Sequence, residues 1–283
     1  MVERHRWLDV MSHGFLIVGV LVIVFPIYLA LVGSTHSAQE MAQSPIPIWF
    51  GHDAWNNYRA ILMGEGPGMT SQVPVARMMW VSLVTALCIA IGKIIISLLS
   101  AFAIVYFKFP FRRVVFWGIF VTLMLPVEVR IVPTYQVIAD FGMVNSFAGL
   151  TIPLIASATA TFLFRQFFLT VPDELAEAAK MDGASPMRFF WDVLLPLSRT
   201  SVAALFVIQF IYGWNQYLWP LLMSTEERMY PIVMGIRSMT AGAEAQVQWN
   251  LVMATAILAM LPPALVVVLM QKWFVKGLVD TEK

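Results

Sequence analysis

Long apolar runs dominate the pattern along the chain and are separated by shorter polar segments. These runs occupy residues 14–33, 79–106, 114–133, 147–168, 202–223 and 251–273. An apolar run of about 18 or more residues with few charges is typical of a membrane-spanning helix, because a hydrocarbon core of about 30 Å needs about 20 residues. The pattern therefore predicts an all-α polytopic membrane protein with six transmembrane helices.

The first apolar run follows Arg4 and Arg6, an order that secretory signal peptides share. A signal peptide has an apolar region of about 7–15 residues and a small-residue cleavage site. This run is longer, and no clean cleavage site follows it. We therefore expect residues 1–33 to form a short head and a retained first span.

The polar segments divide the chain and orient it. Residues 34–78 are rich in turn-forming residues, so we expect a loop outside the bilayer. Residues 79–275 hold the five remaining spans, and residues 276–283 form a tail. Lys and Arg gather on the side of both termini, which predicts cytoplasmic termini and a periplasmic 34–78 loop.

The composition fits a membrane protein and narrows the possible chemistry. Hydrophobic residues make up 59% of the chain and charged residues 12%, the net charge is +1, and the mean hydropathy is +0.76. This balance offers no electrostatic basis for binding nucleic acid. Cys88 lies inside an apolar run, where we expect a packing residue, and the histidines have no metal-ligand spacing. We predict no metal site.

One polar stretch, DELAEAAKMDGASP, interrupts the apolar pattern on the predicted cytoplasmic side. Asp173 suits a helix start and Lys180 a helix end, because their charges oppose the helix dipole. Gly183 supplies a left-handed stop, and Ser185 suits the cap of a second, apolar helix that Pro196 closes. We therefore expect two helices joined by a fixed turn.

The first of these helices carries Ala176, Ala178 and Ala179 beside Glu177, and we expect these small residues to be exposed. One interpretation is an amphipathic connector that lies on the bilayer surface. The other is a peg that fits a socket on a partner protein. The residues alone leave both interpretations open.

A family resemblance favours the peg. Glu177, Ala178 and Ala179, followed by Gly183 and by a distal hydrophobic-x-Leu-Pro group, resemble the EAA motif of permease subunits of binding-protein-dependent ABC importers. In that family the loop forms coupling helices that dock in a cleft of the ATPase subunit. The resemblance implies that residues 171–198 couple this chain to an ATPase, through Glu177, Ala178, Ala179, Asp182, Gly183, Leu195 and Pro196.

The resemblance covers nearly the whole chain. FIYGWNQYLWPLL is similar to maltose-type sugar permeases, and TLMLPVEVRIVPTYQVIADFGMVNSFAGL is similar to permeases of sn-glycerol-3-phosphate importers. It implies a type I importer permease fold in the inner membrane, with sn-glycerol 3-phosphate and glycerophosphodiesters, or another sugar or polyol, as substrate. It also implies a second permease, two ATPase subunits and a periplasmic substrate-binding protein as partners. ATP and Mg²⁺ would bind to the ATPase, and no cofactor to this chain.

Other classes of protein have less support. The chain has no G-x-x-x-x-G-K-[ST] phosphate loop and shows no nucleophile, base and orienting group, so we expect no catalytic activity. An ion-coupled secondary transporter remains an alternative, although we find no internal repeat of the kind expected there. An intramembrane enzyme using Glu128 with Lys93 would need a productive site that the sequence does not display.

Three charged residues, Lys93, Glu128 and Arg130, lie within or at the edge of predicted spans. A Lys or Arg at mid-bilayer costs about 2.5–3.5 kcal/mol, so we expect these side chains to face protein or water. One hypothesis is that these three residues line a translocation path together with Trp214 and Asn215. Lys93 and Arg130 would then help an anionic phosphate ester to cross. The alternatives are internal pairing, packing against the second permease, and aromatic anchoring at the membrane interface.

Overall fold

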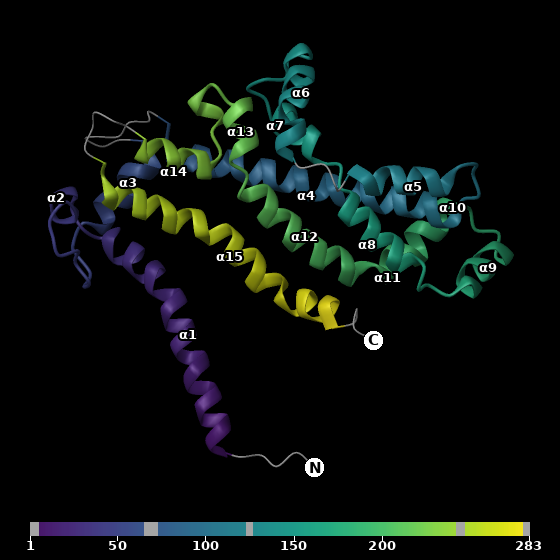
Figure 1. Ribbon diagram of the computed structural model, residues 1–283, viewed down its shortest axis with the longest axis horizontal. Helices are drawn as coiled ribbons and strands as arrows, with labels where there is room; N and C mark the ends of the chain where they lie inside the picture. The colour runs from purple at the N-terminus through teal and green to yellow at the C-terminus, as the bar shows by residue number, and fades with distance from the viewer. Residues whose placement is uncertain (1–5, 65–72, 123–126, 242–246, 280–283) are drawn as a thin grey trace. The chain divides into compact units, whose positions relative to one another are not determined.

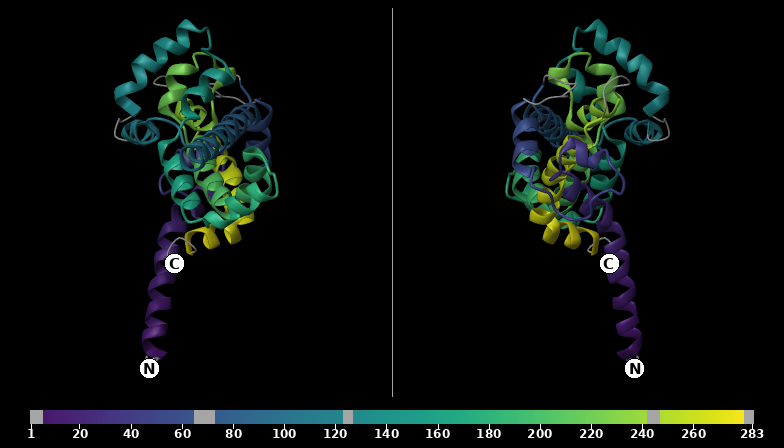
Figure 2. Two further views of the ribbon diagram at one scale, coloured as in Figure 1. Left: turned by 90° about the vertical axis from the view of Figure 1, so that its right-hand side faces the viewer. Right: turned by 90° about the vertical axis from the view of Figure 1, so that its left-hand side faces the viewer.

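The computed structural model describes residues 6–64, 73–122, 127–241 and 247–279, and within these ranges every regular element is a helix (Figures 1 and 2). The chain divides into two compact units. The first unit comprises Met1–Arg77 with Gly235–Leu261, and the second comprises Met78–Met234 with Pro262–Lys283.

Three helices are long and apolar enough to cross a membrane: α1 (Arg6–Gly33), α4 (Val75–Tyr106) and α15 (Trp249–Val279). Two bent pairs also pass when each pair is taken as one span. The described residues therefore hold three candidate spans, or up to five with the bent pairs. The all-α membrane character predicted from the sequence is confirmed.

The predicted third span, residues 114–133, falls on two helices, α5 (Arg112–Val121) and α6 (Val127–Asp140). Residues 123–126, which link them, lie outside the described residues. The predicted span therefore covers most of α5 and the first half of α6.

The predicted fourth span bends by 48°. It consists of α7 (Phe147–Thr151), a 3₁₀ turn (Ile152–Leu154) and α8 (Ala158–Phe168). Pro153 lacks a backbone N–H, which prevents a regular helical hydrogen bond in the turn. The Ser157 hydroxyl then accepts a 3.3 Å hydrogen bond from the Ala160 N–H and caps α8.

The predicted fifth span, residues 202–223, is wrong as one helix. α12 (Arg199–Trp214) ends before Asn215, and α13 (Leu218–Met223) begins after a break. Pro220 has no N–H to bond the Gln216 carbonyl, so an α-helix is not favoured across this segment. A second bend, of 73°, separates α12 from the short helices of Pro186–Leu197 that precede it.

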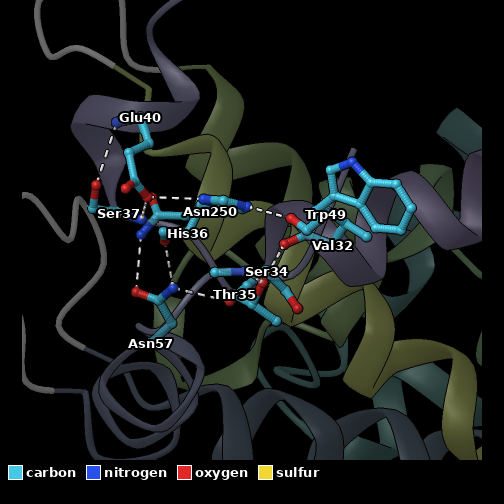
Figure 3. Close-up of polar contacts among 10 residues, drawn as sticks. Val32, Ser34, Thr35, His36, Ser37, Glu40, Trp49, Asn57 and Asn250 are labelled. Carbon is cyan, nitrogen blue, oxygen red and sulfur yellow. Dashed lines mark hydrogen bonds and ion pairs between the residues drawn. The ribbon is translucent and has the colours of Figure 1, made fainter. Parts of the chain in front are cut away.

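The predicted loop of residues 34–78 contains two helices, α2 (Ala38–Met41) and α3 (Ala54–Met63), and the start of α4. Polar contacts hold this part of the first unit together (Figure 3). The buried Asn57 amide donates hydrogen bonds of 2.9 Å to the Ser34 carbonyl and 2.8 Å to the His36 carbonyl. Residues 34–64 are therefore a folded part of the first unit, which we call the cap.

The described residues of the second unit form two buried apolar clusters. One joins α4, α8 and the segment after α9 (Asp173–Met181), and includes Phe102, Phe164, Phe168, Phe189, Phe190 and Leu194. The other includes Val81, Leu150, Trp219 and Met223. α14 (Ile232–Thr240) follows the second cluster along the chain. Figure 1 shows α8, α9, α10 and α11 gathered at one end of this unit.

Candidate functional site

The turn after α9 has the geometry that the sequence predicts. Gly183 has φ +73°, in the left-handed region. Its N–H donates to the Lys180 carbonyl at 3.0 Å, and the Ala184 N–H donates to the Ala179 carbonyl at 2.9 Å. These two bonds form a Schellman motif, which satisfies carbonyls that would otherwise be unpaired at the helix end.

The second helix of the 171–198 loop begins as predicted and ends one residue later than predicted. The Ser185 hydroxyl accepts a 3.3 Å hydrogen bond from the Arg188 N–H at the start of α10 (Pro186–Phe189). A π-helical turn (Phe190–Leu194) and α11 (Leu195–Leu197) continue it. Pro196 therefore does not close the helix. It cannot donate to the Asp192 carbonyl, so a regular α-helical bond is missing at the π-turn.

The α9 helix exposes fewer small residues than the sequence suggests. Ala176 and Ala179 pack against the apolar cluster around Phe190, so the expectation that they are exposed is wrong. They are three residues apart and therefore share one helix face. Glu177, Ala178, Asp182 and Gly183 are exposed, whereas Leu195 and Pro196 are half-buried.

Aromatic contacts fix the loop to the membrane helices of the second unit. The Phe189 ring lies 5.3 Å from the Tyr106 ring at 70°, and the Phe190 ring lies 5.1 Å from the Phe102 ring. Phe102 and Tyr106 belong to the last turns of α4. Movement of the loop is therefore joined to movement of α4 by packed, buried rings.

Lys93 lies inside the second unit, as expected, with 7% of its surface exposed. Its Nζ atom donates a 3.0 Å hydrogen bond to Gln209 Oε1 and lies 3.7 Å from the centroid of the Tyr212 ring. Among the described residues, no carboxylate lies within salt-bridge distance of Lys93. The sequence reasoning missed Gln209, although an isolated glutamine in the apolar run VAALFVIQFIYG was a usable signal.

The other residues named for a path are placed differently. Arg130 is exposed and borders a cavity of about 40 Å³. Trp214 is 2% exposed and stacks on Phe210, whereas Asn215 is exposed after the end of α12. The Glu128 side chain lies outside the described side chains. The structure thus places Lys93 in the interior of the second unit and Arg130 on its surface.

The chain matches a protein family and has full-length relatives. Residues 93–280 match the family described as binding-protein-dependent transport system inner membrane component. Over all of both chains, this chain is 58% identical to the sn-glycerol-3-phosphate transport system permease protein UgpE of Pectobacterium atrosepticum and 56% identical to that of Brucella melitensis.

A solved structure shares the fold. The chain is similar to one in the crystal structure of a bacterial ABC transporter involved in the import of the acidic polysaccharide alginate, with a TM-score of 0.76 and 20% identity over 95% of this chain and 97% of that one. That likeness supports the fold. By its family match and full-length relatives, the chain belongs to the binding-protein-dependent transport system inner membrane components and is a multi-pass, non-catalytic permease of an ABC importer.

Proposed function

We propose that this chain is the permease through which an ABC importer carries sn-glycerol 3-phosphate, and glycerophosphodiesters with it. Full-length identities of 56–58% to permeases named for sn-glycerol-3-phosphate transport support this substrate. The chain works by alternating access between outward-open and inward-open states. A permease for another sugar or polyol is the alternative.

The proposed assembly has this chain paired with a second permease, two ATPase subunits and a periplasmic substrate-binding protein. ATP and Mg²⁺ bind to the ATPase subunits. The chain crosses the inner membrane six times, with both termini and residues 171–198 in the cytoplasm and residues 34–78 in the periplasm. The excess of Lys and Arg on the side of the termini supports this orientation.

The rigid 171–198 loop is the observation that carries the proposed mechanism. A Schellman turn at Gly183, a cap at Ser185 and buried rings at Phe189 and Phe190 leave the loop little freedom. A rigid element transmits force, which a flexible Ser/Gly linker does not. We assign docking on the ATPase to the exposed residues Glu177, Ala178, Asp182 and Gly183, and anchoring to Ala179, Leu195 and Pro196.

Charge reversal on α9 tests this docking face. Glu177→Lys should lower ATP-driven uptake by more than about tenfold, because it reverses a charge at the proposed interface. Asp140→Lys is the matched control, since Asp140 is an exposed carboxylate at the end of α6, outside the 171–198 loop. Uptake into vesicles and co-purification of the ATPase are measured for both. Equal uptake by the two variants would contradict the proposed face.

A second proposal concerns Lys93 and Arg130, which we assign to the path of the anionic substrate. Lys93 is buried with a neutral hydrogen-bond partner, Gln209, and Arg130 is exposed beside a cavity of about 40 Å³ in the same unit. A buried cation in a low-dielectric interior attracts a phosphate group strongly, and an exposed cation adds a weaker attraction because water and salt screen it. Trp214 is buried, so we propose that it packs beside the path without contacting the substrate. We place Asn215, the residue that follows the last turn of α12, on the path itself.

Neutralising either cation tests this path. Lys93→Met and Arg130→Gln should each lower uptake of sn-glycerol 3-phosphate by about tenfold or more, the value of one charge-assisted hydrogen bond. Ser97→Ala is the control, because Ser97 is a buried polar residue of the same helix without a charge. If uptake is unchanged while the complex with the ATPase stays intact, the proposal is wrong and Lys93 and Arg130 have structural roles only.

The energy source and the substrate are tested separately. Uptake into vesicles should follow ATP hydrolysis, and persistence of uptake with an ion gradient alone would favour a secondary transporter. The purified substrate-binding protein should bind sn-glycerol 3-phosphate. If it binds a neutral sugar instead, the proposal of an ABC importer stands, but the proposal that sn-glycerol 3-phosphate is the substrate is wrong.

A further inference from the structure

Three arginines surround a groove in the second unit that the transport mechanism above does not use. The groove has a volume of about 530 Å³ and lies between the end of α4, α5 and α8. Its lining includes Arg112, Arg113 and Arg165 together with Phe116, Trp117 and Phe162. We call this feature the arginine groove.

The positive charge of the arginine groove is uncompensated within the described protein. In the part of the chain that the structure describes, no ion pair involves Arg112, Arg113 or Arg165. Arg112 and Arg113 also stand at the start of α5, where there is no acidic residue and no side-chain cap, so the positive end of the helix adds to their potential. The groove is therefore suited to an anion.

Arg165 packs on an aromatic ring and has unused hydrogen-bonding capacity. Its guanidinium carbon lies 4.2 Å from the centroid of the Phe116 ring, which holds the side chain in place. Its Nε atom is buried and has no hydrogen-bond partner among the described residues. A buried, unsatisfied donor is costly, so a bound acceptor oxygen at this position would be stabilising.

An apolar surface continues from the arginine groove along α5. This helix buries none of its residues, and Val114, Trp117 and Val121 are 65%, 59% and 53% exposed. A guanidinium cluster next to exposed aliphatic and aromatic side chains matches a molecule with a phosphate at one end and hydrocarbon at the other. Tryptophan is enriched at the membrane interface, where such molecules place their head groups.

We propose that the arginine groove binds the phosphate of an anionic phospholipid, whose acyl chains lie along α5. Arg165 and the two arginines of α5 contact the head group, and Trp117 lies at the boundary between head group and chain. Basic pockets between membrane helices bind anionic head groups in this way. The site lies beside the apolar cluster against which the 171–198 loop packs, because α8 carries both Arg165 and the buried Phe164 and Phe168.

Lipid titration of the intact transporter tests the proposal. The complex with its partner subunits is delipidated in detergent and titrated with dioleoylphosphatidylglycerol or dioleoylphosphatidylcholine, and bound lipid is counted by native mass spectrometry. Wild type should prefer phosphatidylglycerol by at least about tenfold, and the variant Arg112→Gln/Arg113→Gln/Arg165→Gln should lose this preference. Arg199→Gln, an exposed arginine at the start of α12, is the matched control and should keep it.

Additional measurements distinguish a phospholipid from free phosphate and from the second permease as the occupant of the groove. Millimolar inorganic phosphate should not displace the bound lipid, and full displacement would identify free phosphate as the ligand and overturn the proposal. An unchanged preference in the triple variant, or crosslinks showing the second permease seated in the groove, would also overturn it. If the triple variant does not assemble, Arg165→Gln alone should reduce the preference severalfold, and no reduction would count against the site.

Discussion

The side-chain amide of Asn250 donates a 2.9 Å hydrogen bond to the buried Oδ1 atom of Asn57, although 193 residues separate the two. Both residues belong to the first unit. Because Asn57 also bonds two backbone carbonyls in the turn after α1, one side chain joins that turn, α3 and the start of α15 (Figure 3). The Asn57 side chain donates two hydrogen bonds and accepts a third, so it holds these three segments together.

We predict that Asn57→Ala destabilises the cap. The change leaves buried carbonyls and the Asn250 amide without partners, at about 1–3 kcal/mol for each unsatisfied group. Amide hydrogen exchange of residues 34–57 should accelerate, as measured by mass spectrometry on the purified complex. Asn56→Ala is the control, since Asn56 is exposed and donates only a long 3.3 Å bond. Similar acceleration in both variants would contradict the prediction.

A histidine in the cap makes its stability depend on pH. His36 Nε2 lies 2.8 Å from the Trp49 carbonyl, and Nδ1 lies 2.8 Å from Glu40 Oε2. Only the protonated ring donates to both oxygens. The Trp49 carbonyl therefore raises the pKa of His36 above 6.5, with Glu40 adding to the effect against partial burial. The Ser37 N–H and His36 lower the pKa of Glu40.

The directions of these shifts define the expected pH window. A raised pKa stabilises the fold fully below about pH 6.5, and the gain is lost as pH rises through the folded-state pKa. The lowered pKa of Glu40 acts in the other direction, and its contribution is lost as the pH falls below about 4.5. Exchange protection of the cap, corrected for intrinsic rates, should therefore fall as the pH rises above about 6.5. His36→Gln should abolish this change, whereas the exposed His52→Gln should retain it.

The local features of the 171–198 loop could be predicted from the sequence, whereas its packing could not. Gly183 and Ser185 act on backbone groups within four residues of themselves, so a short window contains the whole cause. The side of α9 that faces the core depends on Phe189 and Phe190, which follow the turn. Ala176 and Ala179 were therefore assigned to the wrong surface.

Contacts between distant residues and the breaks within spans could not be predicted from the sequence either, because they also depend on tertiary packing. Gln209 is 116 residues from Lys93, and nothing local indicates their hydrogen bond. Pro153 and Pro220 lie in apolar runs, and hydropathy does not distinguish a kinked span from one that ends and restarts. Pro153 accompanies the bend between α7 and α8, and Pro220 follows the break between α12 and α13.

Backbone strain at Gly183 should affect transport more than the same strain elsewhere. Gly183 and Gly142 have φ of +73° and +66°, and both have open space for a Cβ atom. An alanine at either position costs about 1–2 kcal/mol in the left-handed region. We predict that Gly183→Ala lowers ATP-driven uptake and that Gly142→Ala does not, because only the former bends the 171–198 loop. Equal losses in a vesicle assay would show a general stability effect.

Gly149 should tolerate no side chain. Its carbonyl accepts a 3.0 Å hydrogen bond from the Trp219 indole N–H, and an added Cβ would lie far inside contact distance of the Met143 backbone carbonyl. A backbone atom cannot swing aside as a flexible side chain can, so Gly149→Ala must shift α7 or the preceding turn, at about 1–3 kcal/mol. The shift also weakens the Trp219 bond that ties α13 to α7.

The matched comparison for Gly149 is Gly118, a helical glycine of α5 with nothing within 4 Å of an added Cβ. Gly118→Ala should be neutral or stabilising by up to about 1 kcal/mol, because alanine is the better helix former. Thermal unfolding of the purified complex should therefore show a lower midpoint for Gly149→Ala and an unchanged or higher one for Gly118→Ala. A normal midpoint for Gly149→Ala, with the exchange of the Trp219 indole proton unaltered, would mean that α7 and α13 are not held together by this bond.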